Sequence, residues 1–256
     1  MRLDALTFGR LRGFGATDRA LLLLSIVCSA IYFATKSWQP FPGSVALKAL
    51  SIAPLAALAF RLLREPSSHP HGVEWLRDRD NVILAMALTF STLGDVLLDL
   101  DPNHFFVKGL LAFLVAHFIY ILLFVRNWAR PLRPRGWQLA LTAVVLIYSL
   151  LLAQWLSPSL GPVARPVMLY VCAITVMVVA AILAGFSKPW VCSGAILFLI
   201  SDSIIAINKF KTPVAGRDHL VWAAYYLGQY GIAMGFLREK LGEEIPRLPV
   251  QHHQPE

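Results

Sequence analysis

The sequence predicts an all-α polytopic membrane protein, an eight-transmembrane-helix bundle with a weak parallel internal repeat. Three observations predict this fold class. Of the 256 residues, 57% are hydrophobic and only 15% are charged, whereas a soluble domain carries about 25% charged residues. The hydrophobic residues gather in eight runs of about the length that a helix needs to cross a bilayer. The runs are continuous and rich in Leu and Ala, so they lack the alternating polarity of a transmembrane β-barrel.

Residues typical of turns separate the runs and predict where each helix ends. Pro, Gly, Ser or Asn mark these breaks, at 39–43, 65–68, 101–103, 131–136, 157–158 and 212–213. We therefore predict helices, in order, over residues 20–35, 44–62, 82–98, 105–125, 137–156, 166–186, 190–207 and 220–237. The first run follows several Arg residues and lacks a small-residue cleavage site, so we expect a retained helix rather than a signal peptide.

The basic residues predict the orientation. If the N-terminus is cytoplasmic, 16 of the 23 Lys and Arg residues fall in cytoplasmic segments, which the positive-inside rule favours. We expect both termini in the cytoplasm, with a basic N-terminal segment at 1–19, a transmembrane domain at 20–237 and a C-terminal tail at 238–256. The Arg clusters indicate topology and contact with membrane lipids. Nucleic acid is not an expected partner, because no soluble module presents these charges.

Two carboxylates, Asp95 and Asp202, lie deep in the third and seventh runs. A charged side chain at mid-membrane costs about 2.5–3.5 kcal/mol on insertion scales, and such residues are usually functional. Both helices run outward in the expected topology, so the two side chains can share one cavity. Burial together would leave one carboxyl protonated and the other ionised, which suits general acid–base catalysis. The alternative is an intramembrane ion pair with Lys48 or Lys209.

The surroundings of these two Asp residues suggest the repeat. Phe90 to Leu98 contains Gly94-Asp95, and Phe198 to Ile205 contains Ser201-Asp202. A short polar loop and another helix follow each segment. Four helices separate the two segments, so the repeat is parallel, as in some transporters.

Further polar residues form stripes on two other runs. Helical spacing places His117 and Tyr120 on one face of the fourth run, and Tyr225, Tyr226 and Gln229 on one side of the eighth. We expect these five side chains to line the cavity, influence the carboxyls and position a substrate. For His117, the alternative is a structural hydrogen bond.

Three residues near the outer rim are candidates for contact with a phosphate or head group. They are Lys48, Asn208 and Lys209. Lys48 can instead pair with an Asp or snorkel to the interface, and Lys209 can be an ordinary cation at a helix end. Asp99 and Asp101 are expected in the aqueous loop after the third run.

The sequence indicates no metal site. The three cysteines lie in or beside apolar runs and lack paired metal-ligand spacing, while the closely spaced His residues lie in a loop and a tail: Cys28, Cys172, Cys192, His69, His71, His252 and His253. The sequence also lacks the nucleophile-elbow, zinc-protease, Walker and dinucleotide motifs.

Taken together, several motifs resemble the YhhN-like family of membrane proteins. They are Phe90, Gly94, Asp95 and Leu98; Gly109, Phe113, His117 and Tyr120; Gly194, Phe198, Ser201, Asp202, Ala206 and Phe210; and Tyr225, Tyr226 and Gln229. The resemblance extends from the second to the eighth run. One departure is that Ala49 follows Lys48, where the family often has Pro.

The resemblance implies a lysoplasmalogenase: an eight-helix membrane enzyme, with no known organic cofactor, that hydrolyses the vinyl ether bond of an alkenyl lysophospholipid. The products would be a fatty aldehyde and a glycerophosphoethanolamine or glycerophosphocholine. An acid such as Asp95 or Asp202 could protonate the vinyl ether, while the other carboxylate stabilises the cation; the sequence leaves the assignment open. The alternatives are a small proton-coupled transporter and a non-catalytic lysolipid-binding protein that use the same two Asp residues.

Overall fold

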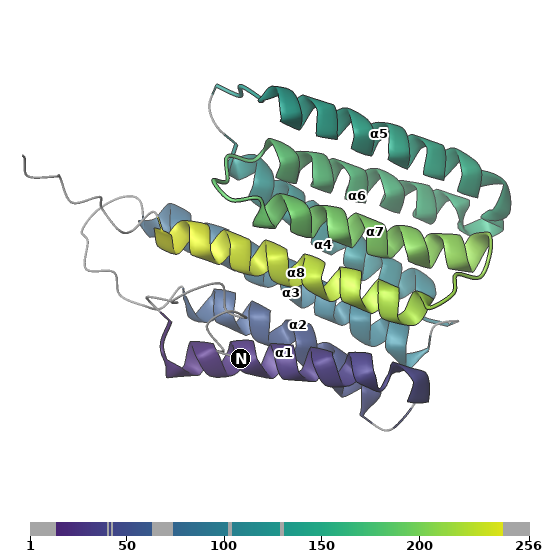
Figure 1. The fold of residues 1–256 in the computed structure, drawn as a ribbon, viewed down its shortest axis with the longest axis horizontal. Coiled ribbons are helices and arrows are strands. Elements are labelled where there is room, and N and C mark those ends of the chain that lie inside the picture. Colours follow the sequence, from purple (N-terminus) through teal and green to yellow (C-terminus); the bar gives the residue numbers. More distant parts are fainter. Residues whose placement is uncertain are drawn as a thin grey trace, which may run out of the picture.

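The computed structural model describes residues 14–39, 41, 43–62, 74–101, 104–128 and 131–242. Within these ranges the structure is helical and contains no β-strand, in agreement with the predicted fold class (Figure 1). The elements are α1 (Ala16–Ala34), η2 (Lys36–Trp38), α2 (Ser44–Arg61), α3 (Glu74–Leu100), α4 (Phe106–Arg126), α5 (Gly136–Leu156), η3 (Ser157–Ser159), η4 (Gly161–Val163), α6 (Ala164–Leu183), α7 (Trp190–Phe210) and α8 (Arg217–Gly242). Most of the expected N-terminal segment and C-terminal tail lies outside the described residues. The same holds for His69 and His71 in the 63–73 connection and for His252 and His253 in the tail.

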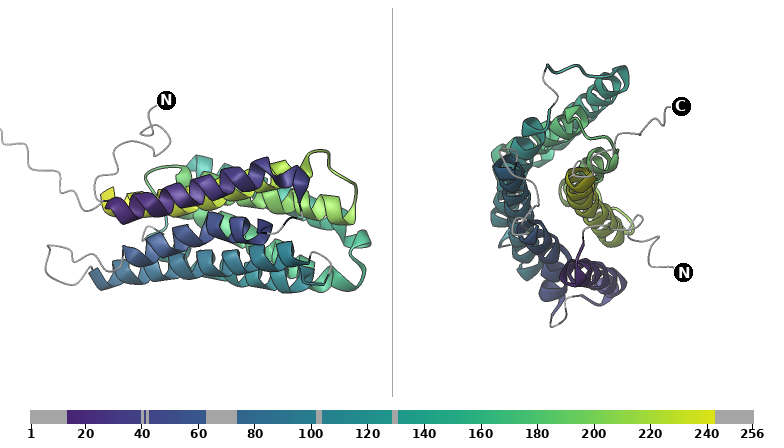
Figure 2. Two further views of the ribbon diagram at one scale, coloured as in Figure 1. Left: turned by 90° about the horizontal axis from the view of Figure 1, so that it is seen from below. Right: turned by 90° about the vertical axis from the view of Figure 1, so that its left-hand side faces the viewer.

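The helices form an arc that partly encloses a helical hairpin. In the end-on view of Figure 2, α1, α2, α3, α4, α6 and α5 follow one another along the arc. The α7–α8 hairpin lies on its concave side, where α8 packs against α1, α2 and α3, and α7 packs against α5 and α6. The hairpin therefore forms the centre of the bundle.

Among the described residues, seven helices, α1 to α7, are long and apolar enough to cross a membrane. The chain is thus a multi-pass integral membrane protein. The eighth helix, α8, is comparably long but less apolar, because its middle carries Gln229 and three tyrosines. Gln229 is fully buried, and the central position of α8 explains how a helix of this composition fits inside the bundle.

Two helices are longer than the apolar runs predict. α3 begins at Glu74 rather than at 82, and α8 extends from Arg217 to Gly242 instead of 220 to 237. The added turns are rich in charged residues. A prediction from hydropathy leaves such residues out of the membrane helix, although here the helix continues through them. The extension of α3 to Leu100 also places Asp99 in the helix, not in the aqueous loop where we expected it.

Glycines allow two antiparallel helix pairs to pack closely. In the α7–α8 pair, a Cβ atom on Gly194 would lie 2.6 Å from the carbonyl oxygen of Gly228. In the α3–α4 pair, a Cβ atom on Gly94 would lie 2.6 Å from the ring of Phe113. Small residues commonly permit such approaches between membrane helices. Each Asp-bearing helix of the proposed repeat is therefore paired closely with the helix that follows it.

Candidate active site

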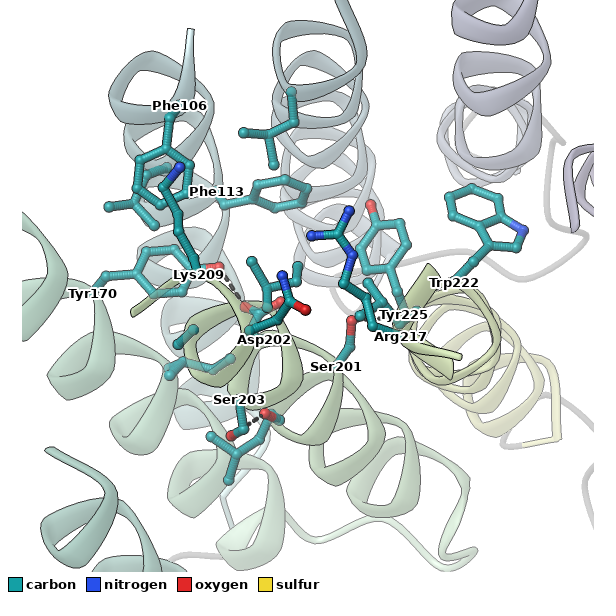
Figure 3. Close-up of a pocket in the computed structure, with 18 of the residues that line it drawn as sticks. Phe106, Phe113, Tyr170, Ser201, Asp202, Ser203, Lys209, Arg217, Trp222 and Tyr225 are labelled. Atoms are coloured by element: carbon teal, nitrogen blue, oxygen red, sulfur yellow. Dashed lines mark hydrogen bonds between the residues drawn. The ribbon is translucent and has the colours of Figure 1, made fainter. Parts of the chain in front are cut away.

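A pocket of about 310 Å³ opens at the end of the bundle where α7 ends and α8 begins. This is the end opposite to the first residue of α1. Asp95 from α3 and Asp202 from α7 both line the pocket, so the structure brings together the two carboxylates that the sequence singled out (Figure 3).

Asp95 is held by a cation and a hydroxyl group. It is 2% exposed, and the Tyr225 hydroxyl donates a hydrogen bond of 2.6 Å to its Oδ2 atom. Its Oδ1 atom lies 3.6 Å from Nζ of Lys48. The same ammonium lies 3.6 Å from Oδ1 of Asp99. Lys48 therefore forms the ion pair that was one of its predicted roles, and it is shared between two carboxylates.

Asp202 has different surroundings. The Tyr170 hydroxyl donates a hydrogen bond of 2.5 Å to its Oδ2 atom. Among the described residues, Oδ1 of Asp202 has no hydrogen-bond or ion-pair partner. Asp202 is also more exposed to the pocket than Asp95. The two carboxylates are thus chemically unequal, because Asp95 is ion-paired with Lys48, whereas Asp202 forms no ion pair with any described residue.

Two predicted lining residues lie behind the pocket instead of on its surface. The Tyr120 hydroxyl donates to Oε1 of Gln229 over 2.6 Å, and Nε2 of Gln229 lies 3.5 Å from the Tyr225 hydroxyl. Of these three hydrogen-bonded residues, only Tyr225 lines the pocket. Helical spacing identified the shared polar face but not which residues on it reach the pocket surface. Tyr120 and Gln229 hydrogen-bond to each other and do not line the pocket.

His117 and Tyr226 also differ from the prediction. Nδ1 of His117 is hydrogen-bonded to the Phe113 carbonyl oxygen, and its ring packs against Tyr170. No carboxylate of the described residues is its partner. The Tyr226 hydroxyl is 3.0 Å from the Ser25 hydroxyl. Neither residue lines the pocket, because both side chains point into helix contacts.

The polar lining residues that sequence reasoning missed include Tyr32, Asp99 and Tyr170. The Tyr32 hydroxyl donates to Oδ1 of Asp99 over 2.7 Å. Tyr32 and Tyr170 each interrupt an apolar run, and that was the available signal. It was weak, because tyrosine near a helix end is also a common interfacial anchor.

The mouth of the pocket carries further cations. Lys36, Lys209 and Arg217 line it together with Asn208. Nζ of Lys36 donates to the Tyr32 hydroxyl and to Gln39. Oδ1 of Asn208 accepts a hydrogen bond from the Val214 backbone, which fixes the short turn between α7 and α8.

The two sides of the pocket differ in polarity. On the side of α1, α2 and α3 the lining includes the charged and hydroxyl groups described above. The side of α5 and α6 is mainly apolar, and we call Leu152, Val167, Val171 and Ile174 the apolar wall. Asp202 stands on α7 between the two sides. An elongated amphiphile is the kind of molecule that matches this division.

No three His, Cys, Asp or Glu side chains of the described residues gather into a group that could hold a metal ion. The three cysteines are separate from one another and are not in disulfide bonds. The polar groups that line the pocket include carboxyl, phenol, ammonium and guanidinium groups.

The fold and the pocket define an integral membrane protein with a pair of unequal carboxylates in a half-polar, half-apolar cavity. The chain belongs to the YhhN family, whose model matches residues 43–236. That match includes Lys48, Asp95, Asp202 and Gln229.

Several relatives are similar over most of their length. Lysoplasmalogenase of Mycobacterium bovis is 34% identical over 199 residues, which cover 75% of this chain and 70% of that protein. Lysoplasmalogenase TMEM86A of Bos taurus is 32% identical over 188 residues, 70% of this chain and 75% of the relative. TMEM86A of Homo sapiens is 32% identical over 193 residues, with coverage of 72% and 74%. No solved structure matches the chain.

Proposed function

We propose that this protein is a lysoplasmalogenase, a membrane enzyme that hydrolyses the vinyl ether bond of alkenyl lysophospholipids. The observation that carries the proposal is the position of Asp95 and Asp202 in one cavity with a cationic mouth and an apolar wall. The names of the relatives support the same activity.

The order of groups in the pocket fits such a lipid. Lys209 is exposed at the end of α7, and Asp202 lies seven residues earlier, about 10 Å deeper along the helix axis. A lysoplasmalogen has its phosphate at the membrane surface, its vinyl ether beneath the glycerol and its chain in the hydrocarbon. The carboxylates would meet the vinyl ether, and the apolar wall would contact the alkenyl chain.

The reaction needs one proton donor and one water. The donor transfers a proton to the β-carbon of the vinyl ether, whose π electrons form the new C–H bond and leave an oxocarbenium ion. Water adds to the α-carbon and returns a proton to the donor carboxylate. The hemiacetal then breaks its bond to the glycerol oxygen, which takes the hydroxyl proton, and gives the aldehyde and the alcohol.

We assign the proton-donor role to Asp202 and the anionic role to Asp95. Lys48 and the Tyr225 hydroxyl both favour the ionised form of Asp95. Among the described residues Asp202 forms no ion pair; its Oδ2 atom accepts the hydrogen bond from Tyr170, and its Oδ1 atom has no hydrogen-bond partner. An ionised Asp95 would stabilise the oxocarbenium ion electrostatically, as carboxylates do in glycoside hydrolysis.

The test is aldehyde release from a purified lysoplasmenyl lipid in detergent. Asp202→Asn and Asp95→Asn are each expected to lose about a hundredfold or more of kcat, the usual size of an acid–base contribution. Asp101→Asn is the matched control, because Asp101 lies outside the pocket. Full activity in either pocket variant would remove that residue from the mechanism, and absence of aldehyde release by the unmodified protein would favour a transporter or a lipid-binding protein.

A further inference from the structure

The pocket is lined by four cations, and their surroundings decide which of them can bind an anion. They are Lys36, Lys48, Lys209 and Arg217. Lys48 is equidistant from two carboxylates, Asp95 and Asp99, so its charge is already compensated. It is therefore a poor anchor for a phosphate.

Lys36 is also unsuited to this role. Its ammonium is engaged by the Tyr32 hydroxyl at 2.8 Å and by Oε1 of Gln39 at 2.7 Å. Burial lowers the pKa of Lys36, and the neighbouring charge of Lys48 lowers it as well. These contacts hold Lys36 beside α1, on the same side of the pocket as Asp99.

The remaining two cations are Lys209 and Arg217. Nζ of Lys209 lies 4.2 Å from the centre of the Phe106 ring, and no carboxylate of the described residues pairs with it. Nε of Arg217 is 2.9 Å from Oδ1 of Asp218, but both side chains are about half exposed, where such a pair contributes little. Both cations can therefore exchange their present contacts for an anionic ligand.

Lys209 and Arg217 stand at the two ends of the α7–α8 turn. Asn208 accepts a hydrogen bond from Val214, and the Arg217 backbone donates to the Val214 carbonyl oxygen, so the turn is fixed at both ends. Figure 3 shows the two side chains extending on either side of Asp202. A flexible ammonium and a planar guanidinium together are a common way to bind phosphate oxygens.

We propose that Lys209 and Arg217 bind the phosphodiester of the substrate and thereby place its vinyl ether at Asp202. This inference rests on the proposed function and adds the basis of selection for a phospholipid over a neutral lipid. Seven covalent bonds separate the phosphorus from the β-carbon of the vinyl ether, which Asp202 would protonate; this is a reach of at most about 9 Å for bonds of about 1.5 Å. That reach is comparable to the axial offset of about 10 Å between Lys209 and Asp202, which the two side chains shorten.

The experiment compares two substrates with the same alkenyl chain, lysoplasmenylethanolamine and 1-alkenylglycerol, which lacks the phosphate. In the double variant Lys209→Gln and Arg217→Gln, KM for the phospholipid is expected to rise at least tenfold. KM and kcat for 1-alkenylglycerol are expected to stay within about twofold of the unmodified protein. Activity on the alkenylglycerol also demonstrates that the variant is folded.

Lys211→Gln is the matched control. Lys211 belongs to the same turn, but its ammonium lies near the Trp155 ring and its side chain does not line the pocket. It should leave the phospholipid KM unchanged, whereas a general effect of surface charge would raise KM in this variant too. Equal losses for both substrates in the double variant, or no change for either, would overturn the phosphate site. Failure of the unmodified protein to cleave any alkenyl lipid would instead overturn the proposed function.

Discussion

Tyr225 connects the buried polar chain to the pocket carboxylate. Its hydroxyl donates to Asp95, while Gln229 lies on its other side and is itself hydrogen-bonded to Tyr120. Because Gln229 accepts from Tyr120 through its oxygen, its amide nitrogen is the group that faces Tyr225. This arrangement directs the hydrogen of the Tyr225 hydroxyl toward Asp95 and favours an ionised carboxylate there.

Removing that donor should weaken catalysis. For Tyr225→Phe we expect kcat to fall about 10- to 100-fold, because a hydrogen bond to a charged group contributes about 1.5–3 kcal/mol. Tyr226→Phe is the matched control, since its hydroxyl contacts Ser25 outside the pocket. Steady-state kinetics of aldehyde release in detergent measure both variants. Equal losses in the two would mean that the effect is one of packing rather than of Asp95.

For single residues, the sequence predicts an unusual residue type better than it predicts which neighbours that residue contacts. A charged residue within an apolar run is unusual enough to identify Asp95 and Asp202 directly. The position of His117 is different, because its spacing from Tyr120 fixes a helix face without saying whether that face meets the cavity or another helix. Tyr170 was missed because a tyrosine fits an apolar run without a large energetic penalty.

The α7–α8 hairpin depends on backbone contact between its helices. A Cβ atom on Gly228 would lie 2.9 Å from the Gly194 carbonyl oxygen and 3.0 Å from the Phe198 backbone nitrogen. These are backbone atoms, so the helices would have to move apart. The movement would displace Asp202, which lies one turn beyond Phe198 on α7.

Gly228→Ala should therefore destabilise the protein, although Ala is the better helix former by about 1 kcal/mol. We expect a loss of about 1–3 kcal/mol, the range for overpacking, and lower activity at elevated temperature. Gly136→Ala is the control, because nothing lies within 4 Å of the added Cβ atom. Thermal unfolding in detergent compares the variants; unchanged stability of Gly228→Ala would argue against tight contact.

Apolar runs predict these elements well and their ends less well. The observed α4 and α7 differ from their runs by a few residues at most. α3 is different, since Glu74 begins a charged stretch that hydropathy assigns to a loop. The close approach at Gly194 and Gly228 could not be predicted, because it depends on which helices become neighbours.

The whole molecule places the pocket mouth at one end of the bundle, opposite to the start of α1. With cytoplasmic termini, as the basic residues predict, the mouth would face the other side of the membrane. The substrate would then come from the outer leaflet, and its phosphate would remain near the aqueous surface.

Cysteine labelling in intact cells can test this orientation. In a variant without the three natural cysteines, a cysteine at exposed Thr212 is expected to react with a membrane-impermeant maleimide. A cysteine at exposed Arg133, at the opposite end of the bundle, should react only after the cells are opened. The reverse pattern would place the pocket mouth on the cytoplasmic side.

The arc itself could be anticipated only in part. Eight helices with short connections predict neighbouring antiparallel pairs, but not that α6 would follow α4 with α5 at the outer edge. That order depends on the packing of side chains far apart in the sequence. The same is true of the position of α8, whose buried Gln229 becomes understandable only inside the bundle.

The central position of the last two helices has a consequence for biogenesis. A nascent chain that has reached only α6 would present Lys48, Asp95 and Asp99 toward lipid, where exposed charges are costly. α8 carries a glutamine and several tyrosines, so the translocon would recognise it poorly as an independent span. We therefore expect α7 and α8 to integrate together, and the incomplete chain to be the form that membrane proteases remove.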